Sequence, residues 1–158
     1  KRTVKVLKSL ANHLDEYQIV AISGRNKKMN NEFLKLYKKV KNDDLHIYKY
    51  TTNVPELMYI SSLVVTKPGG LTSTESLASG LPMLIINPIP GQEEENARFL
   101  EKSGAAVWIK KDDDIDMIVD NLLKDTDKLE KMKENCLALS KMDSTKNICN
   151  IILEKNKK

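Results

Sequence analysis

The feature that most constrains this chain is an alternation of short apolar runs with longer helical patterns through its first two thirds. The runs are rich in β-branched residues and continuously apolar, as in parallel strands covered on both faces, and lie at 18–23, 45–48, 63–66, 83–87 and 105–109. Helical patterns lie at 3–14, 30–41, 55–61, 72–79 and 93–103. This βαβ order predicts an α/β fold with a parallel sheet.

The last third of the chain has a different character. Strand signals stop after residue 109, and helices are predicted at 113–124, 126–140 and 144–155. Because 158 residues make about one domain, we assign residues 113–158 to the same domain as the sheet, 1–158.

Composition and charge exclude several classes of protein. The two cysteines exclude a disulfide scaffold, and the longest apolar run, 81–86, is far too short to span a bilayer. With no export signal visible, we expect a cytoplasmic protein. Residues 1–50 carry 12 Lys and Arg against 5 Asp and Glu, which favours anionic partners. Only three residues are arginines, which argues against nucleic acid as the partner.

Glycines point to one edge of the predicted sheet. Gly24, Gly69, Gly70 and Gly91 each follow a predicted strand. In an open parallel sheet, ligands bind beyond the carboxyl ends of the strands, where loops and helix N-termini converge. The candidate site loops are therefore 23–28, 49–54, 67–75 and 87–96.

The loop at 67–75 carries the strongest signal. Gly69 and Gly70 allow close approach of a ligand, and a helix predicted to start near Thr72 would aim free N–H groups at a diphosphate. Glu75, one turn further, could accept the hydroxyls of a ribose. The alternative is a capping box, in which Thr72 and Glu75 satisfy only the backbone of their own helix.

Two further loops offer polar groups. Gln92, Glu93 and Asn96 present the amides and carboxylate that sugar hydroxyls require, although an acidic first turn also favours its own helix. Arg25, in the segment 23–26, either reaches a phosphate or belongs to a plain surface turn.

No metal or cofactor site is predicted. Asp112, Asp114 and Asp116 imitate the start of a calcium loop, but Met117 and Leu123 replace the required glycine and glutamate. We interpret the aspartates as a helix start. No nucleophile constellation is visible, so the catalytic residues stay unknown.

The segments 63–82 (LVVTKPGGLTSTESLASGLP) and 88–97 (PIPGQEEENA) closely resemble one family. It is the C-terminal donor-binding domain of monogalactosyldiacylglycerol synthases and processive diacylglycerol glucosyltransferases. The family is related to the transferase that adds N-acetylglucosamine to the murein lipid precursor. Weaker similarity at 23–26, 50–57 and 104–106 extends the resemblance over most of residues 3–109.

The resemblance implies a Rossmann-like domain with helices on both faces of the sheet, the C-terminal half of a GT-B glycosyltransferase. Such an enzyme transfers a hexose from a UDP-sugar to a lipid, here diacylglycerol, with inversion and no essential metal. It works at the cytoplasmic face of the membrane as a peripheral protein. The acceptor site, the catalytic base and the contact with the anionic membrane belong to the N-terminal domain.

The resemblance also assigns the donor-binding residues. Val54 would hold uracil through its backbone, and Glu75 would bind the ribose. The diphosphate would lie on Gly69, Gly70, Leu71 and Thr72. Gln92, Glu93 and Asn96 would contact the sugar, and Arg25 and Asn26 belong to the matching upstream segment.

The sequence departs from the family pattern at its start. The acceptor domain is absent, and so are the first strand and glycine-rich loop expected before Lys1, so we expect this chain alone to be inactive. In a sheet of order 3-2-1-4-5-6 the first strand is central. We therefore expect a gap between the runs at 18–23 and 63–66. The missing strand would come from residues before Lys1, from another chain, or from a rearranged sheet.

Three other functions stay open: a murein-precursor N-acetylglucosaminyltransferase, a UDP-sugar epimerase of similar architecture, and a non-catalytic nucleotide-binding module. The sequence specifies neither the hexose nor the lipid acceptor.

Overall fold

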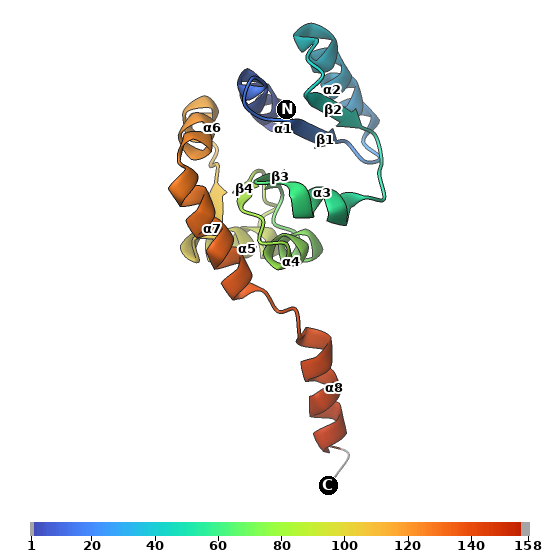
Figure 1. Ribbon diagram of the computed structural model, residues 1–158, viewed down its shortest axis with the longest axis vertical. Helices are drawn as coiled ribbons and strands as arrows, with labels where there is room; N and C mark the ends of the chain where they lie inside the picture. The colour runs from blue at the N-terminus through green and yellow to red at the C-terminus, as the bar shows by residue number, and fades with distance from the viewer. Residues whose placement is uncertain (1, 156–158) are drawn as a thin grey trace.

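The computed structural model describes residues 2–155 and has the predicted alternation of strands and helices (Figure 1). The strands are β1 (Ile19–Ile22), β2 (Leu45–Tyr48), β3 (Val64–Thr66), β4 (Met83–Ile85) and β5 (Ala106–Trp108). The helices are α1 (Arg2–Leu10), α2 (Lys27–Val40), α3 (Val54–Ile60), α4 (Gly70–Ala78), α5 (Gln92–Lys102), α6 (Ile115–Lys124), α7 (Thr126–Leu139) and α8 (Ser144–Lys155), and a short 3₁₀ helix, η1 (Ala11–His13), follows α1.

Every strand pairing is parallel, which confirms the α/β fold. β1 pairs with β2, Ile19 opposite Leu45, while β4 lies between β3 and β5. The strands form a two-stranded and a three-stranded sheet, and in residues 2–155 no ladder joins β1 to β3. The expected gap is therefore confirmed; which segment fills it stays a prediction.

Side chains and backbone geometry explain where several elements begin and end. Asn26 caps α2 by accepting the Met29 N–H at 3.0 Å, and Asp114 caps α6 by accepting the Met117 N–H at 3.1 Å. The interpretation of the aspartate cluster as a helix start is therefore confirmed. The turn from α4 into β4 passes through Gly80 at φ +61°, a backbone conformation that favours glycine.

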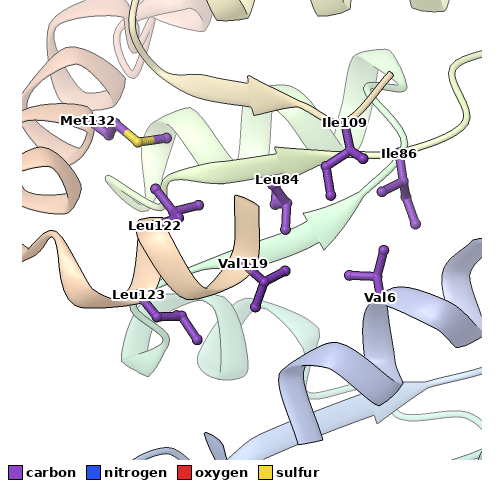
Figure 2. Packing of buried hydrophobic residues seen from close by; sticks show 8 residues of the cluster. All are labelled: Val6, Leu84, Ile86, Ile109, Val119, Leu122, Leu123 and Met132. Carbon is purple, nitrogen blue, oxygen red and sulfur yellow. The ribbon is translucent and has the colours of Figure 1, made fainter. Parts of the chain in front are cut away.

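The three-stranded sheet carries the main core. All of β4 is buried between helices, and α1, α6 and α7 cover one face of the sheet (Figure 2). The side chains that pack there are Val6, Leu84, Ile86, Ile109, Val119, Leu122, Leu123 and Met132.

The β1–β2 sheet has a separate core, built around Leu7, Phe33 and Leu45. Val6 and Leu7 are neighbours on α1, yet they belong to different cores. Helix α1 therefore packs against both sheets.

Helix α8 extends away from the rest of the molecule (Figure 1). Its apolar residues Ile148, Ile151 and Ile152 are exposed. Among residues 2–155 no helix combines the length and apolar character needed to cross a bilayer.

Candidate functional site

The candidate site is built from the loops that leave the carboxyl ends of β1 to β4. Helix α5 is in direct contact with the loop after β3, because Asn96 Nδ2 of α5 donates to the Pro68 carbonyl at 2.9 Å. Pro68 itself is buried. This hydrogen bond fixes the start of α4 beside the start of α5.

Helix α4 begins two residues before the predicted start at Thr72. Gly69 is its N-cap residue, and the Ser73 N–H donates to the Gly69 carbonyl at 2.9 Å. The N–H groups of Gly70, Leu71 and Thr72 come before this first helical donor, so they have no partner within the helix. Aligned N–H groups at a helix N-terminus favour an anion.

Gly69 and Gly70 leave the approach to this helix end open. Neither has a positive φ, so their conformation does not require glycine. A Cβ added to either would meet no atom of the described residues within 4 Å. The space in front of the helix N-terminus is therefore free at both glycines. Leu71, the residue after Gly70, is 83% exposed.

Glu75 is exposed on the second turn of α4 and does not cap the helix. Because the N-cap is Gly69 and no side chain donates or accepts a cap hydrogen bond there, the capping-box alternative for Thr72 and Glu75 is wrong. The sequence suggested it through spacing alone, with Thr72 as an N-cap three residues after the real N-cap, Gly69. In residues 2–155 no side-chain hydrogen bond engages the Glu75 carboxylate, which leaves it available to a ligand.

Ser73 adds a polar group beneath the helix end. Its Oγ is buried and, within the described part of the chain, has no hydrogen-bond partner. The neighbouring hydroxyls of Thr74 and Ser76 instead donate back to the carbonyls of Gly70 and Thr72 at 2.8 Å.

The loop before α5 is held by its own side chains. Glu93 Oε2 accepts the Ile89 N–H at 2.7 Å, and the backbone turns through Asn87 at φ +45° and Gly91 at φ +95°. Glu93 thus holds the loop before α5, and Asn96 holds the loop before α4. The sequence reasoning missed both roles because they depend on the tertiary positions of these loops. Gln92 is exposed at the first position of α5.

The upstream residues lie at two other helix starts. Asn26 caps α2, so its side-chain oxygen is engaged, while Arg25 is exposed beside Gly24 at φ +58°. Val54 is the first residue of α3, and the Leu57 N–H donates to the Asn53 carbonyl at 3.1 Å. The Val54 N–H comes before that donor and so lies outside the hydrogen bonds of the helix.

Most of the candidate site lies on an open surface and not in a hollow. One hollow of about 620 Å³ lies along α2, and another of about 530 Å³ lies between β1 and β3. Of the predicted site residues only Val54 lines either of them. Among the described residues no three His, Cys, Asp or Glu side chains are grouped to hold a metal ion.

Comparisons with known proteins give the chain its family. The sequence model of the glycosyltransferase family 28 C-terminal domain matches residues 2–150. Processive diacylglycerol beta-glucosyltransferase of Bacillus pumilus is 39% identical over 141 residues, covering 89% of this chain and 37% of the relative. The enzyme of that name from Bacillus subtilis is 36% identical over 156 residues, covering 97% and 41%.

The fold agrees with the sequence match. The crystal structure of Acinetobacter baumannii MurG matches with a TM-score of 0.67 at 15% identity, covering 89% of this chain and 53% of MurG. The chain thus spans about two fifths of the length of the Bacillus relatives. The match over residues 2–150 shows that the chain belongs to glycosyltransferase family 28, as part of its C-terminal domain, with a Rossmann-like fold of the GT-B type.

Proposed function

We propose that this chain binds the donor for a hexosyltransferase that moves a hexose from UDP to diacylglycerol with inversion. The names of the Bacillus relatives support the lipid acceptor. The observation that carries the donor assignment is the open N-terminus of α4. Two glycines there leave space for a ligand, and the free carboxylate of Glu75 lies on the next turn.

Each part of the donor has a proposed partner. The diphosphate binds the N–H groups of Gly70, Leu71 and Thr72 above Gly69, helped by Arg25 and the Asn26 segment. Glu75 accepts the two ribose hydroxyls, and the backbone of Val54 binds uracil. Gln92 donates to the sugar hydroxyls, while Glu93 and Asn96 contact the same sugar with the carboxylate and amide oxygens that their loop bonds leave free.

The proposed chemistry requires little from this chain beyond stabilising a leaving group. An acceptor hydroxyl attacks C1 of the hexose from the face opposite UDP, the C1–O bond to the diphosphate breaks, and the hydroxyl proton goes to a base. Negative charge develops on the departing diphosphate, where the N–H groups of α4 already point. No step of this scheme uses a metal ion or another cofactor.

The base, the lipid site and the contact with an anionic membrane are assigned to the remainder of a longer protein. We propose that the whole enzyme is peripheral to the cytoplasmic face of the membrane and binds no nucleic acid. This chain alone should then bind the donor without transferring its sugar.

Calorimetry with this chain tests the proposal. UDP and UDP-glucose should bind in buffer containing EDTA with the affinity measured without it, and ADP-glucose should bind more weakly. Loss of UDP binding on chelation would refute metal-free binding, and equal binding of ADP-glucose would refute recognition of uracil. A marked preference for UDP-N-acetylglucosamine would favour the murein-precursor transferase. If the full-length protein converted the UDP-sugar to its epimer and transferred no sugar, the epimerase would be favoured.

A further inference from the structure

Positive charge is concentrated on the helices α1 and α2. Helix α1 carries three Lys or Arg residues and α2 carries five, whereas Glu32 is the one acidic residue in either of them. Residues 51–158, by contrast, hold 14 Lys and Arg against 17 Asp and Glu. The excess of cations therefore belongs to one part of the fold, and a local excess of this kind attracts an anionic partner.

Helix α2 has one buried face and one exposed face. Phe33 and Leu36 are buried in the core of the β1–β2 sheet. The exposed side borders the hollow of about 620 Å³, whose lining residues are Lys28, Asn31, Glu32, Leu34, Lys35 and Lys38. All six belong to α2, so in the described part of the chain no other element covers this face.

Most lysines of this face have no acidic partner. Of the lysines of α2, only Lys35 forms an ion pair within residues 2–155, with Glu32 at 2.7 Å. The hydrogen bond from Lys35 lowers the pKa of Glu32, and the positive charges of Lys8 and Lys28 lower it as well. Glu32 thus lies among lysines of both helices. We call the following group the basic patch: Lys8, Lys28, Leu34, Lys35 and Lys38.

Two features distinguish between the possible anionic partners. Helix α2 contains no arginine, and Nη2 of Arg2 in α1 is buried, whereas arginine is the residue that most often contacts bases and forks phosphates in nucleic acid. Leu34 and Tyr37, 40% and 37% exposed, lie one turn apart beside the lysines. Such side chains among lysines suit the headgroup region of a bilayer, where apolar atoms leave water while ammonium groups stay at the lipid phosphates.

We propose that the basic patch binds the surface of a membrane that contains anionic phospholipids. Helix α2 lies at the periphery of the molecule beside β2, and it starts directly after the candidate site loop that leaves β1 (Figure 1). The membrane contact therefore lies next to the edge of the sheet that carries the candidate site. It involves headgroups and no deep insertion, because the apolar face of α2 already packs into the core.

This contact is separate from the one assigned above to the remainder of a longer protein. It rests on the charge and exposure of α1 and α2 and goes beyond the proposed function. No residue of the basic patch belongs to the proposed donor site. Failure of the membrane test would therefore leave donor binding as proposed, and failure of donor binding would leave the basic patch as proposed.

Vesicle binding by the full-length protein tests the proposal. One variant combines Lys28→Gln, Lys35→Gln and Lys38→Gln, and the probe is sucrose-loaded vesicles of phosphatidylcholine with about 30% phosphatidylglycerol. Each lysine near an anionic surface contributes about fivefold to binding, so this variant should bind about 100-fold more weakly. The difference should shrink at high salt, because exposed charges are screened. An unchanged affinity, or a difference that high salt leaves as it is, would overturn the proposal.

A matched variant separates the basic patch from net charge. Lys128→Gln, Lys131→Gln and Lys133→Gln remove the same charge from α7, where the lysines are also exposed and Lys131 pairs with Glu134 at 2.8 Å. This variant should lose less than about fivefold, and a loss equal to that of the patch variant would overturn the proposal. Because all six lysines are exposed, urea midpoints close to that of the unmodified protein should show that both variants fold.

Duplex DNA is the competing partner. If the patch variant lost affinity for a DNA duplex and kept its affinity for anionic vesicles, the patch would bind nucleic acid and the proposal would be wrong. Leu34→Gln removes an apolar contact with the headgroup region, so it should weaken vesicle binding about fivefold and leave binding of the duplex unchanged. An equal effect of Leu34→Gln on both ligands, or an effect on neither, would overturn the assignment to a membrane.

Discussion

Replacing Glu75 with alanine separates ligand binding from helix stability. Helix α4 is capped at Gly69 without a side-chain bond, and Glu75 is exposed further along it. Glu75→Ala should therefore change the free energy of unfolding by no more than about 0.5 kcal/mol, as is typical of surface positions. A capping box would have cost about 0.5 to 2 kcal/mol.

The effect on the nucleotide should be much larger. Hydrogen bonds to a charged group are worth about 1.5 to 3 kcal/mol, so losing the ribose contact should weaken UDP about 10- to 150-fold. Inorganic pyrophosphate uses only the helix N-terminus, and its affinity should stay unchanged. Calorimetry of both ligands, with urea unfolding of the same samples, measures the two effects.

Glu95→Ala provides the matched control, because Glu95 is an exposed glutamate near the start of α5 to which we assign no donor contact. It should leave both affinities as they are. Equal weakening of UDP and pyrophosphate by Glu75→Ala would refute the ribose assignment, and so would unchanged UDP binding.

Two further predictions concern stability. Asn96→Ala removes the donor to the Pro68 carbonyl and should lower the free energy of unfolding, measured in urea, by about 1 to 3 kcal/mol. The control Glu95→Ala should lower it by about 0.5 kcal/mol at most. Equal effects of the two changes would mean that the 2.9 Å hydrogen bond does not hold α5 to the loop before α4. Burial raises the pKa of the Cys136 thiol from 9.0 to about 11, so its stabilising contribution is complete below pH 9 and is lost as the pH rises to 11, because the unfolded thiol ionises first. Urea unfolding of the protein and of Cys136→Ala across that range should show their difference shrinking, and a constant difference would contradict the raised pKa.

The order of elements could be predicted because each depends on local pattern. The strand 45–48 has the predicted limits, and the gap between β1 and β3 follows from the order of strands in a doubly wound sheet. The start of α4 was wrong by two residues, since Thr72 and Glu75 have the spacing of a capping box and sequence alone does not reveal that Gly69 begins the helix.

The bonds within the candidate site were beyond prediction for a different reason. The contact of Asn96 with Pro68 joins α5 to the loop before α4, and that of Glu93 with the Ile89 N–H depends on the turn through Asn87 and Gly91. Each of these hydrogen bonds depends on the path of the backbone, which the periodicity of the sequence does not reveal. Residue types at the site were predictable, but their partners were not.

The placement of Val6 and Leu7 in different cores bears on how the chain unfolds. The β1–β2 sheet contacts the rest of the molecule chiefly through α1, without hydrogen bonds between β1 and β3 in residues 2–155. Proteins open in cooperative units whose boundaries follow such weak connections. The β1–β2 unit should therefore open at a lower free energy than the β3–β5 unit, with α1 as the thermodynamic coupling between two folding units.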